Sequence, residues 1–243
     1  KTVMQLEWAR LATEPDAAGN ALVVAPLAVC RQTIREAAKL DQLVRYAPDA
    51  AALDSPGIWI TNYERAARFD PSLFDAVVLD ESSILKNADG KMRRLLIEQF
   101  ADVPYRLACT ATPAPNDPEE LTSQAEFLGR STRANMLSAY FVHDSDGWRL
   151  KGHARGPMVR WMASWALAIR RPSDMGYPDG DYQLPGLDIV PHLLPVDAVP
   201  EGQLFASDLG GVGGRAKVRR DTLAPRCDAA IALVNQSHGD VAW

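Results

Sequence analysis

The stretch Phe74-Asp75-Ala76-Val77-Val78-Leu79-Asp80-Glu81-Ser82-Ser83 decides the fold, because its apolar run ends abruptly in two carboxylates. The run from Ala76 to Leu79 is continuous, which predicts a strand buried on both faces. Asp80 and Glu81 then lie at the carboxyl end of that strand, and in an open parallel sheet ligands bind at this edge. A magnesium-holding aspartate and a water-activating glutamate would belong there. The alternative is a buried strand that simply meets solvent with two acids.

Further elements alternate along the first half of the chain. Apolar segments predict strands at Ala21–Ala25, Ile58–Thr61 and Tyr105–Thr110. Helical spacing predicts helices at residues 1–12, 29–40 and 91–100. Alternating strands and helices are typical of an α/β fold, with a mainly parallel sheet and helices on both faces.

Short polar motifs follow the predicted strands. They are Pro26-Leu27, Thr61-Asn62, Asp80-Glu81 and Thr110-Ala111-Thr112. Because parallel strands end at a common edge, we expect all four motifs at the same edge of the sheet.

The chain opens with Lys1-Thr2 and then a helical pattern. The apolar stripe of this helix is formed by Met4, Trp8 and Leu11, widened by Leu6 and Ala9. A Lys-Thr pair before a helix is what remains when a phosphate-binding loop, G-x-x-x-x-G-K-[ST], is cut just before its lysine. As a bare dipeptide the signal is nearly worthless, and without the other motifs chance is the favoured explanation. Since no initiating Met precedes Lys1, we expect a fragment whose natural start lies upstream.

With these motifs, the first half of the chain resembles the first RecA-like domain of superfamily 2 helicases and translocases. The likeness is closest to the Swi/Snf-type branch as it occurs in phage and prophage proteins. The matching motifs follow the family's order: Lys1-Thr2, Ala25-Pro26-Leu27, Thr61-Asn62-Tyr63-Glu64, Asp80-Glu81-Ser82-Ser83 and Thr110-Ala111-Thr112-Pro113. The resemblance covers residues 1 to about 130. Ser82-Ser83 departs from the commoner Ala-Asp or Ala-His, which leaves open whether the protein separates strands or only moves along a duplex.

The resemblance implies a P-loop NTPase that uses ATP and Mg²⁺. Residues 1–195 would form the first RecA-like domain, truncated within its phosphate loop, and residues 196–243 a linker and the start of a second such domain. Asp80 and Thr2 would hold Mg²⁺, and Glu81 would orient and deprotonate the attacking water. Lys1 would neutralise charge on the γ phosphate. Thr110 and Thr112 would couple the nucleotide site to the nucleic-acid cleft.

DNA is the expected partner, and RNA is not excluded. In the resemblance, Pro26, Thr61 and Asn62 belong to motifs on the nucleic-acid side. A separate basic cluster contains Arg149, Lys151, His153, Arg155 and Arg160, with Trp148 and Trp161 among its members. Cations beside aromatic rings could grip a phosphate backbone and stack on bases. The alternative for Arg149, Lys151 and Arg155 is a solvated face, and for Trp161 and Trp165 it is the core.

The composition of the chain argues against some classes of function and location. The formal net charge of -5 argues against bulk attraction to nucleic acid, so contact requires a local basic surface. Three widely separated cysteines favour a reducing compartment over a disulfide framework. No apolar stretch approaches membrane-spanning length. We therefore expect no membrane partner and a cytoplasmic, bacterial or phage-encoded protein.

The second half gives weaker signals. They predict a helix at 117–138, irregular chain at 139–151, a helix at 158–169, a strand at 188–194 and a helical segment at 216–236. Gly210–Gly214 is interpreted as a flexible loop, because no buried strand precedes it. Residues 240–243 are interpreted as the start of a strand.

The leading hypothesis is an ATP-driven helicase or translocase whose first lobe is this chain. The arginines that complete its ATP site would lie on the second lobe, so we expect residues 1–243 alone to hydrolyse ATP negligibly. One alternative is the motor subunit of a restriction-modification system. The other is a non-catalytic nucleic-acid-binding module, against which the intact Asp80 and Glu81 weigh.

Overall fold

The computed structural model describes residues 1–13, 19–86, 90–114, 116–144, 147–182, 186, 189–194, 219–220 and 222–236. The chain divides into two compact units, Lys1–Ala168 and Ile169–Trp243. The predicted domain boundary between residues 195 and 196 lies outside the described residues, as do Gly210–Gly214 and residues 240–243. No helix of the described residues is long and apolar enough to cross a membrane.

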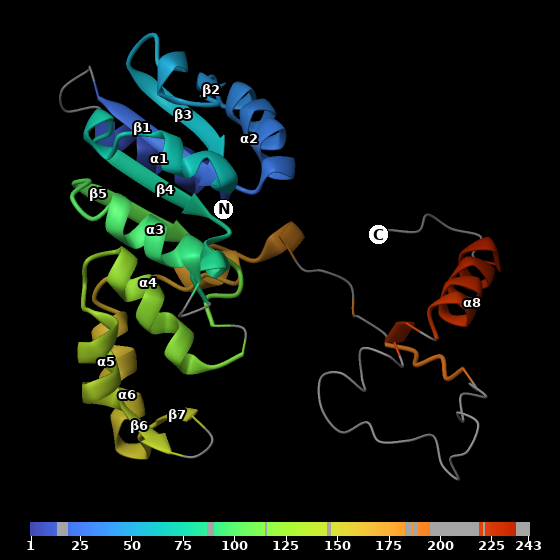
Figure 1. The fold of residues 1–243 in the computed structure, drawn as a ribbon. Helices are drawn as coiled ribbons and strands as arrows, with labels where there is room; N and C mark the ends of the chain where they lie inside the picture. The colour runs from blue at the N-terminus through green and yellow to red at the C-terminus, as the bar shows by residue number, and fades with distance from the viewer. Residues whose placement is uncertain are drawn as a thin grey trace. The chain divides into compact units, whose positions relative to one another are not determined.

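The first unit is built on a five-stranded parallel sheet of order β2-β3-β1-β4-β5 (Figure 1). The strands are β1 (Asn20–Ala25), β2 (Val44–Tyr46), β3 (Gly57–Asn62), β4 (Ala76–Asp80) and β5 (Tyr105–Cys109). The residues of β4 are all buried, because helices cover both faces of this central strand. Four of these strands were predicted, and β2 was missed because three residues are too short to show a period.

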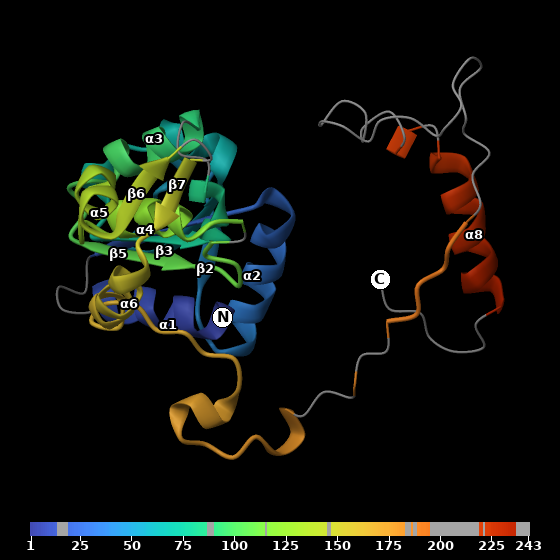
Figure 2. The same cartoon turned by 90° about the horizontal axis from the view of Figure 1, so that it is seen from below.

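Helices pack on both faces of the sheet, with α1 on one face and α3 on the other (Figure 2). The helices of this α/β layer are α1 (Thr2–Thr13), α2 (Leu27–Lys39) and α3 (Lys91–Gln99). Successive residues of β4 alternate between the two cores: Val77 and Leu79 pack with α3, and Val78 packs with α1 and α2. Hydrophobic burial on both faces therefore fixes the register that brings all the strand ends to one edge.

A smaller helical layer follows β5. It contains α4 (Leu121–Phe127), α5 (Arg133–Tyr140), β6 (Phe141–Asp144), β7 (Gly147–Leu150) and α6 (Arg155–Met162). Its core is formed by Ala125, Met136, Leu137, Phe141 and Met158. Trp161 and Trp165 pack against this cluster with ring centroids 5.2 Å apart, which confirms their interpretation as core residues.

The predicted stripe of α1 is partly wrong. Leu6 and Ala9 are buried against the sheet, but Met4 and Leu11 are more than half exposed. The third buried residue is Gln5, whose side chain turns toward β4. The face of α1 that meets the sheet therefore carries Gln5, Leu6 and Ala9, and Met4 and Leu11 lie outside it.

The predicted helix at 117–138 is two helices. Gly129 ends the first at φ 66°, in the left-handed region that favours glycine, and Thr132 caps the second by accepting from the backbone N–H of Asn135 at 3.2 Å. The segment predicted to be irregular contains an antiparallel hairpin, β6–β7, in which His143 lies opposite Trp148. Its strands of four residues each were too short to recognise.

In the second unit the main element is α8 (Leu223–Gln236), so the described part of the predicted 216–236 segment is helical from residue 223. Pro225 lies in its first turn, where proline is tolerated. The predicted strand at 188–194 is wrong for Ile189–Leu194, which form no strand. The predicted helix at 158–169 ends at Met162, before the unit boundary.

Candidate functional site

The side chains of Lys1, Asp80 and Glu81 meet at the carboxyl end of β4. The Lys1 Nζ atom lies 3.0 Å from Asp80 Oδ1 and also donates to the Glu81 carboxylate. The fold thus brings the first residue of the chain to two carboxylates eighty positions away. This is the cluster that the sequence predicted for the ATP site.

The two carboxylates change the pKa of Lys1. Partial burial alone would lower the pKa of Lys1, but hydrogen bonds from its ammonium group to Glu81 and Asp80, together with their negative charges, outweigh burial and raise the pKa. Lys1 is therefore held in its cationic form. A cation beside two carboxylates can equally pair with a phosphate brought to the same place.

Asp80 is 2% exposed and its carboxylate is held by several donors. Besides Lys1, its Oδ1 atom accepts a 2.8 Å hydrogen bond from Gln5 Nε2 and a 3.1 Å bond from the backbone N–H of Glu81. Gln5 is itself buried. Sequence reasoning missed Gln5, although a glutamine one helical turn after Lys1 was a usable signal.

Glu81 differs from Asp80 because its side chain is 40% exposed. One carboxylate is therefore fixed inside the strand end and its neighbour is open to water. A buried aspartate whose Oδ1 atom is held by three donors suits the holding of a cation, and an accessible glutamate suits the activation of a water molecule.

The residues present fit Mg²⁺ bound together with a nucleotide. Among the described residues, no group of three or more His, Cys, Asp or Glu side chains could hold a metal ion unaided. Mg²⁺ usually takes one or two carboxylates and completes its octahedron with substrate phosphates and water. Asp80 can supply the carboxylate, and Thr2 lies in the first turn of α1, beside Lys1. The unpaired N–H groups of that turn also favour an anion.

The predicted coupling residues lie on the neighbouring strand end. Asp80 pairs with Cys109 across β4 and β5, so Thr110 follows directly on the same edge. The Thr110 hydroxyl accepts a 3.0 Å hydrogen bond from the backbone N–H of Thr112. Both threonines are at least partly accessible, and their role in coupling stays a prediction.

The predicted nucleic-acid residues occupy different settings. Pro26 is half-buried where α2 begins. Thr61 is fully buried and Asn62 is 4% exposed. The Asn62 side chain accepts a 3.0 Å hydrogen bond from the Tyr46 hydroxyl and donates to Glu64. Direct contact with a nucleic acid through Thr61 or Asn62 would require the end of β3 to become accessible.

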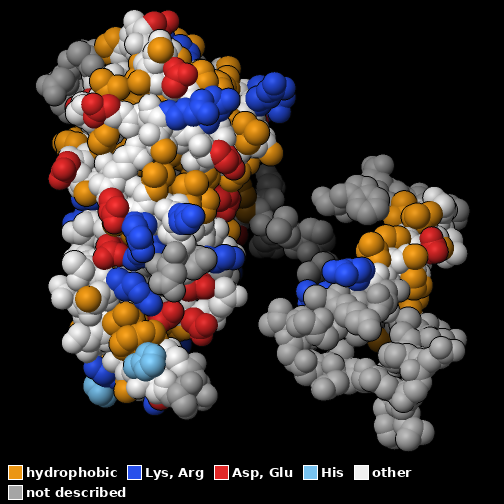
Figure 3. All heavy atoms as spheres, viewed as in Figure 1, with side chains coloured by type: hydrophobic (Ala, Val, Ile, Leu, Met, Phe, Trp, Pro, Cys, Tyr) orange, Lys and Arg blue, Asp and Glu red, His pale blue; other side chains and the backbone are white. Residues whose placement is uncertain are grey.

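The basic cluster is on and beside the β6–β7 hairpin. Arg149 pairs with Asp144 at 3.2 Å, and Lys151 donates to the backbone carbonyls of Ser138 and Ala139, whereas Arg155 is exposed at the start of α6. On the face shown in Figure 3, Lys and Arg side chains are interspersed with Asp and Glu. Contact with a phosphate backbone at this face would therefore rely on individual cations.

Two more residues reach the strand end from distant elements. The Tyr63 hydroxyl donates to the Asp80 carbonyl at 2.6 Å, and Gln124 Nε2 donates to the Ser82 carbonyl at 2.9 Å. Burial, and then the charges of Asp80 and Glu81, raise the pKa of Tyr63 well above its ordinary value. Tyr63 stood in a recognised motif without a role, and nothing in the sequence pointed to Gln124.

Comparison with solved structures identifies the fold. The chain is similar to the SWI2/SNF2 ATPase core of Sulfolobus solfataricus, solved in complex with dsDNA, with a TM-score of 0.51 and 18% identity over 68% of this chain and 43% of that one. It is also similar to the UvsW helicase of bacteriophage T4, with a TM-score of 0.41 and 15% identity over 52% of this chain and 48% of that one. No family model and no curated protein matches the sequence. The chain thus spans less than half of each solved structure. The first likeness confirms the predicted α/β fold, with its mainly parallel sheet and helices on both faces.

Proposed function

We propose that this chain is the nucleotide-binding lobe of a nucleic-acid-dependent ATPase of the superfamily 2 helicase or translocase type. The observation that carries the proposal is the placing of Lys1 on both Asp80 and Glu81 at the carboxyl edge of a parallel sheet. The fold shared with the SWI2/SNF2 core supports it. A lysine shared by both acids is a more specific arrangement than the hydrogen bonds that any buried aspartate requires.

In this proposal each side chain has one task. Asp80 and the Thr2 hydroxyl would hold Mg²⁺, which when bound would supply Lewis-acid stabilisation of charge on the nucleotide. Lys1 leaves its carboxylate partners to pair with the γ phosphate. Glu81, which is then free of Lys1, accepts a proton from the attacking water.

DNA is the proposed nucleic acid, because the similar SWI2/SNF2 core was solved with double-stranded DNA. Arg149 and Arg155 are the accessible cations that we propose for backbone contact. Such contacts do not depend on base sequence, and RNA would satisfy them as well.

The complete site needs a second lobe in this proposal. Residues of this chain would hold the metal ion, activate the water and supply the lysine. Arginines from a second RecA-like lobe would stabilise charge on the transferred phosphoryl group. Residues 1–243 alone should therefore hydrolyse ATP negligibly. DNA-stimulated turnover by this 243-residue chain would refute that expectation.

Glu81→Gln in the full-length gene product tests the role of Glu81. We expect ATP binding to persist and turnover to fall about 10²- to 10⁴-fold, because an amide cannot take the proton. The matched control is Glu98→Gln, which makes the same change on an exposed residue of α3. Equal ATPase activity in Glu81→Gln and wild type would remove Glu81 from the mechanism.

The same variants separate the alternatives. A non-catalytic nucleic-acid-binding module would bind DNA but show no turnover in either variant. A restriction-modification motor would show the same dependence on Glu81, together with a nuclease or methylase activity in the assembly that contains it.

A further inference from the structure

The backbone of Glu81 adopts an uncommon conformation, with φ 56°. Left-handed φ values are costly for residues other than glycine, and they are tolerated best by asparagine and aspartate. Among the described residues, Asp41 is the other non-glycine residue with positive φ. Since Asp41 is of the tolerated type and Glu81 is not, the surrounding structure must impose the conformation of Glu81.

Two side-chain hydrogen bonds hold the backbone carbonyls of Asp80 and Ser82, the residues before and after Glu81, while the carbonyl of Glu81 itself accepts from the Ile84 N–H at 3.3 Å. They run from the Tyr63 hydroxyl to the Asp80 carbonyl and from Gln124 Nε2 to the Ser82 carbonyl. We call this pair of bonds the Tyr63–Gln124 clamp. Tyr63 is 4% exposed, Gln124 5% and Ser82 0%. Water therefore cannot replace either donor, and losing one would leave a buried acceptor unpaired.

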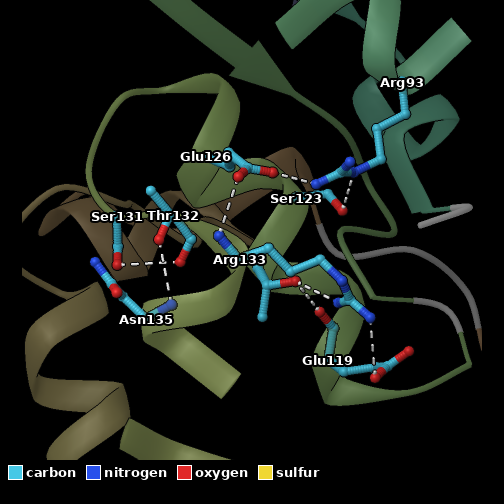
Figure 4. A network of polar contacts seen from close by, with 9 residues as sticks. Arg93, Glu119, Ser123, Glu126, Ser131, Thr132, Arg133 and Asn135 are labelled. Atoms are coloured by element: carbon cyan, nitrogen blue, oxygen red, sulfur yellow. Dashed lines mark hydrogen bonds and ion pairs between the residues drawn. The ribbon is translucent and has the colours of Figure 1, made fainter. Parts of the chain in front are cut away.

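Tyr63 and Gln124, the two donors, both belong to well-packed parts of the fold. Tyr63 belongs to the core beneath the sheet, and its hydroxyl crosses the end of β1 to reach β4. Gln124 lies on α4, which is tied to α3 by Arg93 (Figure 4). Arg93 donates to Ser123 Oγ at 2.9 Å and pairs with Glu126. Gln124 therefore has little freedom to follow the backbone if Glu81 relaxes.

We propose that Tyr63 and Gln124 are positioning residues that hold Glu81 in its left-handed conformation and thereby aim its carboxylate. The contribution of this positioning to catalysis rests on the proposed function, in which Glu81 is the water-activating base. The clamp itself is a structural claim, and it can be tested without any ATPase assay.

The clamp is tested by thermal unfolding of the 243-residue chain carrying Glu81→Gly or Glu81→Gln. Both changes remove the charge that pairs with Lys1, but glycine adopts positive φ without a steric penalty. With the clamp intact, we expect Glu81→Gly to melt about 2–4 °C above Glu81→Gln. With Tyr63→Phe and Gln124→Met added, residue 81 can relax and the difference should disappear.

A second left-handed position provides the control. Asp41→Gly and Asp41→Asn should differ in melting temperature by the same amount with and without the clamp, because Asp41 is not held by it. If the double clamp variant fails to fold, Tyr63→Phe and Gln124→Met are used singly, and each should reduce the difference at residue 81. An undiminished difference at residue 81 in these variants would overturn the proposal.

The catalytic consequence is measured separately in the full-length gene product. Tyr63→Phe and Gln124→Met should each lower kcat for ATP about 10- to 100-fold with less than about twofold change in KM, because a misplaced base affects the transition state and not substrate binding. Gln99→Met is the matched control, since Gln99 also donates to backbone carbonyls, those of Ala66 and Phe69, at 2.9 and 2.7 Å. Unchanged kcat in both clamp variants would refute the positioning role. Absence of ATPase activity in the wild type would refute the proposed function, while the melting comparison would still decide the clamp.

Discussion

Alkaline pH should destabilise the protein through Tyr63, and Tyr63→Phe should remove this effect. Tyr63 is buried and donates its hydroxyl proton to the Asp80 carbonyl, and its pKa is raised in the folded chain. In the unfolded chain the phenol ionises near its ordinary pKa of about 10. Above that pH the unfolded chain gives up a proton that the folded chain retains.

The size of the effect follows from linkage. When a group stays protonated in the folded chain but ionises in the unfolded chain, the free energy of unfolding falls by about 1.4 kcal/mol for each pH unit above the unfolded pKa. The stabilisation from the protonated Tyr63 hydroxyl is therefore complete below pH 10 and is lost as the pH rises above it. At pH 8, Tyr63→Phe should be about 1–3 kcal/mol less stable than wild type, because it leaves a buried carbonyl unpaired. By pH 11.5 that gap should close by roughly 2 kcal/mol.

Urea unfolding of the 243-residue chain, measured between pH 8 and pH 11.5, provides the assay. Lys1 also has a raised pKa and loses its contribution at alkaline pH, but it does so in wild type and variant alike. Gln124→Met is the control, because it removes the other bond of the clamp without removing a titrating group, and its curve should run parallel to that of wild type. Parallel curves for Tyr63→Phe and wild type would show that this phenol is not held protonated by the fold.

Three further substitutions test the packing around the site, each by its unfolding free energy in urea. Phe100→Ala empties a fully buried position behind the sheet and should cost about 3–5 kcal/mol; a cost under about 1 kcal/mol would contradict its place in the core. Arg93→Met leaves Glu126 without its partner across α3 and α4 and should cost about 1.5–3 kcal/mol, and a neutral result would mean that the ion pair does not fix α4. Thr132→Ala removes the cap on Asn135 and should cost about 1 kcal/mol, with Thr132→Ser restoring most of it.

The sheet could be predicted because its signals are local. A continuous apolar run such as that of β4 predicts a strand buried on both faces. The helices between the strands show apolar residues at helical spacing. Once the strands are parallel, their polar ends must share an edge. The meeting of Lys1 with Asp80 and Glu81 was expected from the resemblance to the helicase family, and parallel topology alone did not place Lys1 there.

Other features escaped prediction for physical reasons. The break between α4 and α5 depends on the left-handed conformation of Gly129. Apolar residues continue on both sides of this glycine, so the sequence predicted a single helix. The β6–β7 hairpin is too short for a period to show. The exposed residues of α1 were misassigned because the buried face includes a polar residue, Gln5, which an apolar stripe does not count.

The Tyr63–Gln124 clamp was least accessible to sequence reasoning. Its donors lie 17 residues before Asp80 and 42 residues after Ser82. Tyrosine and glutamine are common residues, and only the folded chain places these two against the carbonyls beside Glu81. The positive φ of Glu81 likewise has no signal in the sequence, since nothing about a glutamate predicts it.

The central claim is that Lys1, Asp80 and Glu81 form the metal and water side of an ATP site that responds to nucleic acid. It is tested most directly by steady-state ATP turnover of the full-length gene product, measured with and without duplex DNA. We predict turnover that DNA stimulates and that Glu81→Gln lowers at least about 100-fold. A wild-type protein that shows no turnover with duplex DNA, single-stranded DNA or RNA, or a Glu81→Gln variant that turns over ATP as fast as wild type, would contradict the claim.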